Sequence, residues 1–189
     1  MQKRTILFLD TEFTGLNQDA ELISIALINE AGDHSFYAEF SDYESAKLAD
    51  WHHQNVLPHL LFQPTKPLPE VPAGCQMLHG NTQEITAALK NWLAQFPQIE
   101  IWADVLPYDW VLFCELFGGA RQLPEHIFYI PFDFATLLKC RGLNPDMDRV
   151  ALAALPEDTV RHNALQDARI TRLGFQRLMA DAAFLDLRS

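Results

Sequence analysis

The stretch FLDTEFTGL, residues 8–16, decides the fold of this chain. It continues an apolar run that predicts a buried strand over Thr5–Leu9, and two acids, Asp10 and Glu12, follow directly. Side chains at positions i and i+2 of a strand point to the same side, so these two carboxylates converge. Close carboxylates repel each other and raise each other's pKa. The arrangement therefore favours a divalent cation, unless both acids lie in a loop beyond the sheet and face water.

Two more strands are expected soon after the first. The segments Glu21–Asn29 and His34–Phe40 have strand patterns, and the turn Glu30–Asp33 between them is typical of a hairpin. Three consecutive short strands predict an antiparallel arrangement. The next segment, Asp42–Leu61, has apolar residues at mixed spacing and predicts a helix followed by a loop.

A proline-rich segment then interrupts the pattern. Five prolines lie between residues 58 and 72, which excludes a regular helix or a central strand there. Neither side is long enough for an independent core. We therefore expect a surface excursion at about residues 56–80 within a single domain that spans residues 1–189.

Helices and strands alternate in the second half of the chain. The expected elements are a helix over Thr82–Phe96, a strand over Ile99–Ala103, a helix over Pro107–Leu116, a strand over His126–Pro131 and helices over Asp133–Cys140, Asp148–Leu155 and Asn163–Ala183. Right-handed crossovers place the later strands parallel to the first strand, on its other side. The pattern thus predicts an α/β fold with a mixed five-stranded sheet, three antiparallel strands and then two parallel ones, flanked by helices.

Composition narrows the classes of protein. Hydrophobic residues make up 49% of the chain, which indicates a folded protein, and the formal charge of −11 argues against a protein that coats nucleic acid nonspecifically. An enzyme whose acidic site binds metal ions stays possible. No basic leader and no run of about 18 apolar residues is present, so we expect no membrane association. Three widely spaced cysteines indicate reduced thiols and a cytoplasmic location.

The start of the last helix brings a histidine and an acid together. In RHNALQDARIT, residues 161–171, Asn163 suits the N-cap position and Gln166 follows three residues later, as in a capping box. His162 then lies just before the helix and Asp167 one turn inside it. A mobile histidine and a fixed acid suit a general base and a metal ligand. The alternative is a surface histidine and a helix-face acid without a common task.

A further acid lies in WADVLPYDWVLFCELFGG, residues 102–119. Pro107 fits the first helical turn, so Asp109 falls in that turn with apolar residues behind it. A carboxylate there also interacts favourably with the helix dipole, which requires no catalysis. Asp104, in the preceding turn, competes for the same role.

These motifs resemble the DEDDh group of 3′-to-5′ exonucleases, which have a ribonuclease H-like fold and include oligoribonuclease, ribonuclease T and the proofreading domains of DNA polymerases. DTEFTGL is similar to the first motif of the group, YDWVLF to the second and HNALQDA to the third. The resemblance runs from residue 5 to about residue 175, and the size of the chain looks most like a small bacterial or phage exoribonuclease. Many relatives carry Asn or His where this chain has Asp104, which therefore either supports the site or makes it more acidic.

The resemblance implies a metal-dependent reaction. Four carboxylates, on Asp10, Glu12, Asp109 and Asp167, would bind two Mg²⁺ or Mn²⁺ ions, and His162 would act as general base. It also implies contacts with the terminal nucleotide from Phe13, Thr14, Gly15 and Leu16. Phe13 and Leu16 can equally be packing residues, and Arg161 is either a phosphate contact or a solvated arginine.

Three hypotheses for function follow. The first is a 3′–5′ exoribonuclease that acts on single-stranded RNA or a 3′ overhang and, like many relatives, forms a homodimer. The second is a DNA exonuclease or nucleotide phosphodiesterase with the same site. The third is a non-catalytic nucleic-acid-binding domain, which has no physical need for four convergent acids. His52, His53 and His59 lack cysteine or aspartate partners at matching spacing, so we expect no zinc site there.

Overall fold

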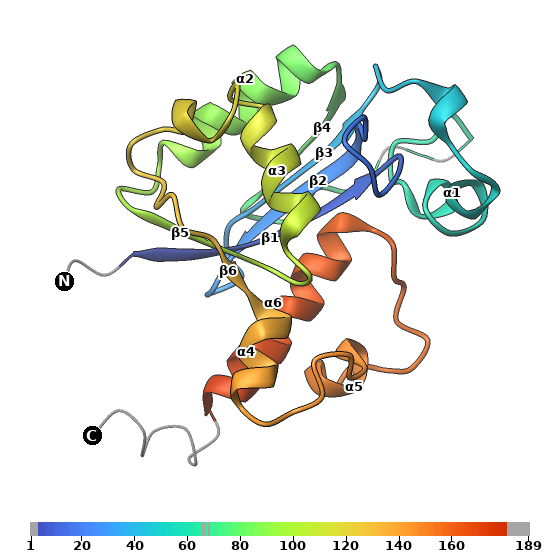
Figure 1. Ribbon diagram of the computed structural model, residues 1–189. Helices are drawn as coiled ribbons and strands as arrows, with labels where there is room; N and C mark the ends of the chain where they lie inside the picture. The colour runs from blue at the N-terminus through green and yellow to red at the C-terminus, as the bar shows by residue number, and fades with distance from the viewer. Residues whose placement is uncertain (1–3, 66, 68, 181–189) are drawn as a thin grey trace.

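The computed structural model describes residues 4–65, 67 and 69–180. Its centre is a mixed six-stranded sheet with the strand order β4-β3-β2-β1-β5-β6 (Figure 1). The strands are β1 (Thr5–Phe13), β2 (Leu22–Asn29), β3 (Ser35–Phe40), β4 (Cys75–Gly80), β5 (Ile99–Ala103) and β6 (Phe132–Asp133). β1, β2 and β3 pair antiparallel, and β5 pairs parallel with β1 on its other side. The predicted α/β class and the placement of the later strands are confirmed.

Two features of the sheet differ from the prediction of five strands. Residues 75–80, which we assigned to the excursion, form β4 and pair parallel with β3, so the excursion is shorter than predicted. The prolines end before the pairing with β3 begins, so they do not interrupt the strand. In the sequence, however, they hid its pattern. The strand predicted over His126–Pro131 is wrong in its position: only a bridge between Ile127 and Ile99 forms there, and β6 begins after Pro131, which has no N–H to donate.

β1 is longer than the predicted strand and contains both acids of the opening motif. Its pairing with β2 continues through Asp10, opposite Ala26, and Glu12, opposite Ser24, before the register shifts at Phe13. The two acids therefore lie within the sheet, and the alternative of a solvent-facing loop is wrong.

Helices cover both faces of the sheet. One face packs against α2 (Thr82–Leu93) and α3 (Pro107–Glu115), and the other against α4 (Phe134–Cys140) and α6 (Ala164–Ala180) (Figure 1). The alternation along β1 assigns each residue to a face. Leu7 and Leu9 belong to the core on the α2 side, whereas Phe8 belongs to the core on the α6 side. Asp10 and Glu12 share the parity of Phe8 and so face the side of α6.

Local signals set the ends of the long helices. Asn163 caps α6 as predicted, since its side-chain oxygen accepts the N–H of Gln166 at 3.1 Å. α2 begins after Asn81, which forms a capping box with Glu84, and ends at Leu93, three residues before the predicted end. The predicted last residues of α6, 181–183, lie outside the described part of the chain.

Short helices replace the single helix that was predicted after β3. They are η1 (Ser45–Lys47), α1 (Asp50–Asn55) and η2 (Leu57–His59), with Pro58 inside the last one. The second half of the chain adds η3 (Ala120–Gln122) and α5 (Arg149–Ala153), and α5 packs on α6 through Val150 and Ile170. No helix in the described ranges is long and apolar enough to cross a lipid bilayer.

Candidate active site

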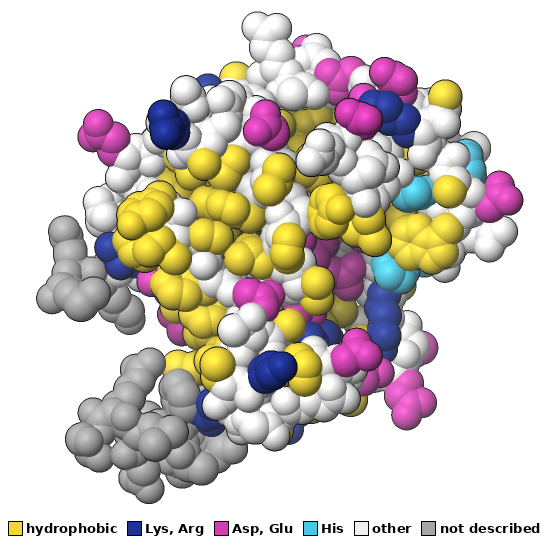
Figure 2. Space-filling view, viewed as in Figure 1, with side chains coloured by type: hydrophobic (Ala, Val, Ile, Leu, Met, Phe, Trp, Pro, Cys, Tyr) yellow, Lys and Arg dark blue, Asp and Glu magenta, His cyan; other side chains and the backbone are white. Residues whose placement is uncertain are grey.

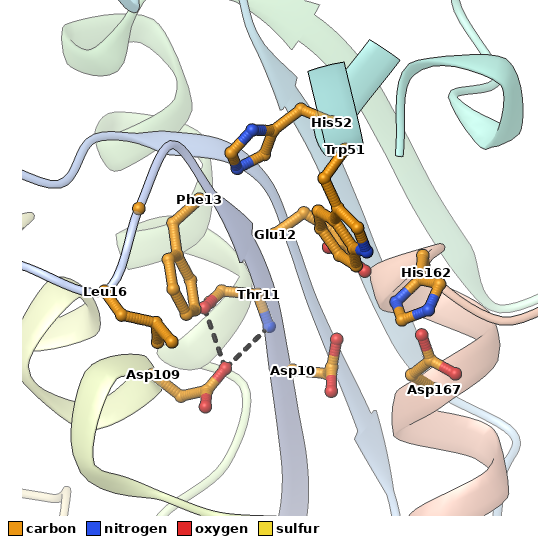
Figure 3. A pocket seen from close by; sticks show the side chains of 11 residues that line it. Asp10, Thr11, Glu12, Phe13, Leu16, Trp51, His52, Asp109, His162 and Asp167 are labelled. Atoms are coloured by element: carbon orange, nitrogen blue, oxygen red, sulfur yellow. Dashed lines mark hydrogen bonds between the residues drawn. The ribbon is translucent and has the colours of Figure 1, made fainter. Parts of the chain in front are cut away.

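Five predicted site residues from three elements meet in one cavity. Asp10 and Glu12 come from β1, Asp109 from the first turn of α3, His162 from the residue before the cap of α6, and Asp167 from its first turns (Figure 3). All five line a cavity of about 490 Å³. In the space-filling view, acidic side chains lie at the bottom of a hollow, with histidine and apolar side chains beside it (Figure 2).

Asp109 is attached directly to β1. Its Oδ1 accepts two hydrogen bonds from Thr11, one from the backbone N–H at 2.8 Å and one from the hydroxyl at 2.7 Å. Both groups are buried. Thr11 points away from the side of Asp10 and Glu12, and it thereby holds the start of α3 against the strand that carries the other acids.

Asp104 has a different partner. Its carboxylate accepts two hydrogen bonds from the guanidinium of Arg149, at 2.7 Å and 2.9 Å. Backbone carbonyls of Met147 and Pro145 also accept from Arg149. Asp104 lines a second cavity of about 480 Å³, which shares Asp10, His162 and Asp167 with the first. The ion pair neutralises Asp104 locally, so the geometry favours Asp109 over Asp104 as the fourth acid.

Burial and mutual repulsion keep the four carboxyl groups hard to ionise. Desolvation raises the pKa of Glu12 to about 8, of Asp109 to about 7 and of Asp167 to about 6, and raises the pKa of Asp10 well above its usual range. Charge repulsion from neighbouring acids adds to the pKa of Asp10 and Glu12. In the described part of the chain, no lysine or arginine forms an ion pair with any of the four. An uncompensated cluster of this kind suits a divalent cation.

The donor set also fits such a cation. Glu12, His162 and Asp167 each offer a ligand atom, and these atoms lie within 4.8 Å of one another. Carboxylate oxygens are the ligands that Mg²⁺ and Mn²⁺ prefer.

His162 adopts a backbone conformation that is unusual for a residue with a side chain. Its φ is +59°, and the edge of its ring meets the ring of Trp51 with centroids 5.0 Å apart (Figure 3). Left-handed backbone at a residue other than glycine costs on the order of 1 kcal/mol and occurs often at functional sites. Burial, together with the charges of His59 and Arg161, lowers the pKa of the His162 ring. Burial thus favours the neutral ring, which is the form that can accept a proton.

The predicted nucleotide contacts separate into two groups. Phe13, Gly15 and Leu16 line the cavity, and Leu16 is 74% exposed at its mouth. Thr14 instead supports the turn, because its hydroxyl accepts the N–H of Glu21 at 3.0 Å and its own N–H donates to the carbonyl of that residue.

Arg161 is exposed, and its guanidinium donates to Asp148 at 2.8 Å and 2.9 Å. It lines the second cavity rather than the first. This placement keeps both of its interpretations open, a phosphate contact or a solvated arginine.

Three residues at the site were not assigned to it from the sequence. Trp51 and His52, both on α1, line the cavity, and Tyr108 stacks on Phe13 with centroids 5.5 Å apart. His52 Nδ1 accepts the N–H of Ala49 at 2.9 Å, so a neutral ring carries its proton on Nε2. For Trp51 and His52, the available signal was the run of one tryptophan and two histidines in the short polar helix DWHHQN. Among the described residues, the group that could hold a metal ion contains His162 and none of the three histidines near α1.

Solved structures with the same fold include a metal-bound protein and a nuclease. Pop2p of S. pombe, solved in its Mg²⁺ and Mn²⁺ bound form, superposes with a TM-score of 0.64 at 15% identity, covering 95% of this chain and 84% of that one. The cell-death related nuclease CRN-4 superposes with a TM-score of 0.61 at 16% identity, covering 95% and 64%. The superpositions and the sheet define the class by its fold: a ribonuclease H-like α/β fold, here with an acidic cavity.

Sequence comparison identifies the family within this class. The chain belongs to the Rv2179c-like 3′-5′ exoribonuclease domain family, whose model matches residues 5–178. It is 30% identical over 164 residues to the 3′-5′ exoribonuclease Rv2179c of Mycobacterium tuberculosis, covering 86% of each chain. It is also 31% identical over 86 residues to the uncharacterized exonuclease CP81 of Escherichia phage 186, covering 46% of this chain and 31% of that protein.

Proposed function

We propose that this protein is a DEDDh-type, metal-dependent 3′–5′ exoribonuclease that hydrolyses phosphodiester bonds from the 3′ end of single-stranded RNA or of a 3′ overhang. The observation that carries the proposal is the convergence of four carboxylates and His162 in one cavity. The family of the chain supports the reaction and RNA as the substrate. The presence of the full set of acids argues against a non-catalytic binding domain.

Asp10, Glu12, Asp109 and Asp167 would hold two Mg²⁺ or Mn²⁺ ions. Four carboxylates with a charge of about −4 match two such ions, and oxygen ligands suit them. When bound, the ions supply an activated water and stabilise the charge on the leaving 3′ oxygen. The mixed Mg²⁺ and Mn²⁺ content of the Pop2p structure supports this choice of metal.

His162 would act as the general base. Its ring lies beside the acids, and its lowered pKa leaves a ring nitrogen free to take the proton of the attacking water at neutral pH. The contact with Trp51 limits the orientations of the ring, while its position before the helix cap permits a small movement.

Apolar surfaces in the cavity would hold the terminal nucleotide. Phe13 and Trp51 lie on either side of the cavity, and Leu16 lies at its mouth (Figure 3). Aromatic faces stack on any base and contribute about 1–3 kcal/mol per base. Stacking between such surfaces is independent of base identity, as expected of an enzyme that degrades RNA step by step.

Two further expectations rest on the sequence. The homodimer is an expectation from the family resemblance, and the cytoplasmic location is an expectation from the widely spaced cysteines. Light scattering during size-exclusion chromatography tests the first. A molecular mass of one chain, at the concentration used for the activity assay, would contradict it.

The activity assay compares end-labelled single-stranded RNA and DNA of equal sequence, with Mg²⁺, Mn²⁺ or a chelator. We expect stepwise shortening of the RNA from its 3′ end, loss of activity with the chelator, and loss of activity in Asp10→Ala. Asp158→Ala removes an exposed acid that does not line the cavity, so this matched control should keep full activity. Activity that survives the chelator or Asp10→Ala contradicts the mechanism, and a preference for DNA contradicts the substrate.

A further inference from the structure

A chain of buried polar side chains runs under the site, among apolar neighbours. It consists of Glu39 and Tyr37 on β3 and Asn163 at the cap of α6, which are 2%, 0% and 6% exposed. The Tyr37 hydroxyl donates to Glu39 Oε1 at 2.6 Å. Asn163 Nδ2 donates to the Tyr37 oxygen at 3.4 Å and to the carbonyl of His59 at 2.9 Å.

Each bond in this chain has one possible direction. The Asn163 side-chain oxygen accepts the N–H of Gln166, so its amide nitrogen must face Tyr37 and His59. Burial and the neighbouring Glu39 raise the pKa of Tyr37, which keeps its hydroxyl protonated and donating. Glu39 also accepts the backbone N–H groups of Leu61 and Phe62. A chain of bonds with fixed directions specifies one geometry more strictly than apolar packing does.

The chain connects three segments that are far apart in the sequence. Two members of the chain lie on β3. Residues 59–62, which begin with the last residue of η2, attach to the chain through three backbone groups. α1, just before η2, carries Trp51 and His52 into the cavity wall. On the other side, the backbone N–H of Asn163 donates to Asp167 Oδ2 at 3.2 Å. Asn163 also directly follows His162, whose ring contacts Trp51.

We propose that Glu39, Tyr37 and Asn163 are positioning residues of the active site, which hold the turn carrying His162 and the start of α6 carrying Asp167 in register with the wall formed by Trp51 and His52. None of the three lines the cavity, so they act through the residues that do. The inference rests on the proposed function for its effect on catalysis. Its structural part, the coupling of residues 59–62 to the α6 cap, stands independently of that function.

Tyr37→Phe tests the proposal with the loss of one hydroxyl group. We expect kcat on single-stranded RNA to fall roughly 10-fold or more, since small misplacements of catalytic groups cost up to about 100-fold. KM and the Mn²⁺ affinity should change much less than kcat, because the side chains that line the cavity are all still present and only their alignment shifts. Asn163→Ser keeps a side chain that caps helices but loses both Nδ2 bonds, and it should show the same division between kcat and KM.

Phe36→Leu is the matched control. Phe36 lies next to Tyr37 on the same strand, but its side chain packs against Trp92 on the opposite face of the sheet. It should lower the melting temperature and leave kcat nearly unchanged when assayed well below that temperature. The positioning role is overturned if Phe36→Leu loses as much kcat as Tyr37→Phe, or if Tyr37→Phe keeps full kcat.

Hydrogen exchange measured by mass spectrometry gives a readout that needs no activity. Tyr37→Phe should speed exchange in peptides that cover residues 57–62 and 161–168, and leave those from α2 unchanged. Unchanged exchange in both segments overturns the coupling. A wild-type protein that is inactive on RNA contradicts the proposed function alone, since the exchange result still decides the coupling.

Discussion

Asp109 shows how the surroundings of a single residue fit its proposed role as a metal ligand. Burial raises its pKa to about 7, while the N–H and the hydroxyl of Thr11 stabilise its ionised form through one oxygen. The two effects oppose each other, and a nearby cation would favour the ionised form further. Burial also disfavours the charged form of His162, which lowers its pKa instead of raising it, because the charged form of histidine is the protonated one.

Thr11→Val removes the hydroxyl donor and keeps the shape and the backbone N–H. We expect a loss of about 1 kcal/mol in unfolding free energy, because a buried acceptor loses one of its hydrogen bonds. The pKa of Asp109 should rise further, and the Mn²⁺ affinity measured by calorimetry at pH 7 should fall several-fold. Thr86→Val is the control, since its buried hydroxyl makes no hydrogen bond within the described structure. Equal Mn²⁺ affinity in wild type and Thr11→Val would show that this hydroxyl does not contribute to metal binding.

His162→Asn removes the proposed base and suits the backbone, because asparagine adopts left-handed conformations readily. Loss of a general base lowers kcat by about 10²–10⁴-fold. The Mn²⁺ affinity should change little if the carboxylates supply the ligands. His53→Asn, an exposed histidine on α1, is the control and should keep its activity. A collapse of metal affinity in His162→Asn would instead make His162 a ligand.

At the scale of elements, the turn between β5 and α3 separates two acids, Asp104 and Asp109, which the sequence offers as candidates for the same position in the site. Asp104, at the end of β5, is directed to Arg149 at the start of α5, whereas Asp109, one turn into α3, is directed to β1. The ion pair thus attaches α5 to the end of β5. It also places the positive charge of Arg149 beside Asp104, whose own charge raises the pKa of Asp10, Asp109 and Asp167.

Asp104→Asn and Asp109→Asn therefore have different consequences. Asp104→Asn leaves the guanidinium of Arg149 without its carboxylate and should cost about 1.5–3 kcal/mol in unfolding free energy. Its Mn²⁺ affinity should stay within a few-fold of wild type. Asp109→Asn should abolish exonuclease activity and weaken Mn²⁺ binding with little loss of stability. Denaturant unfolding measures the loss of stability and calorimetry measures the loss of Mn²⁺ affinity. If Asp104→Asn weakened Mn²⁺ binding and Asp109→Asn did not, Asp104 would be the fourth ligand.

At the scale of the whole molecule, the acids of the active site add negative charge to a protein that is already negative. The formal charge is −11, and the four acids of the cavity contribute to it only at the pH values where they ionise. The metal-free fold therefore carries an electrostatic penalty that grows with pH. Binding of divalent cations removes this penalty and reverses the local field toward a phosphate.

The pH dependence of stability follows from the sign of these shifts. The folded pKa values of about 6 to 8 lie above the usual range of carboxyl groups. At pH values between the usual carboxyl pKa and these folded values, the folded state therefore binds more protons than the unfolded state. The stabilising effect is complete below about pH 4 and disappears as the pH rises through 6 to 8. We expect the melting temperature of the metal-free protein to fall between pH 5 and 8, and Mn²⁺ to restore it.

The variant Asp10→Asn is the control for this profile, because it removes one of the repelling charges. Its melting temperature should fall less steeply over the same pH range than that of the wild type. Parallel profiles for the two proteins, measured by scanning calorimetry with a chelator present, would assign the pH dependence to groups outside the site.

The sequence was informative wherever a signal was local. The spacing of Asp10 and Glu12 reflects the two-residue repeat of a strand, and the cap at Asn163 reflects hydrogen bonds to its next turn. β4 was missed, because an edge strand after a run of prolines depends on its pairing with β3 rather than on a pattern of its own. Trp51 and His52 were not assigned to the cavity, because a short polar helix does not reveal what it faces.

The sequence by itself determined the α/β class, the shared side of Asp10 and Glu12 on their strand and the class of chemistry they permit. These properties follow from repeats of two to four residues, which operate within one element. Only the tertiary structure decided which side chains are partners: Thr11 with Asp109, 98 residues away, and Tyr37 with Asn163, 126 residues away. Such pairs form because packing of the sheet and helices removes water from both groups, and a buried polar group must then find its partner in whichever segment lies opposite.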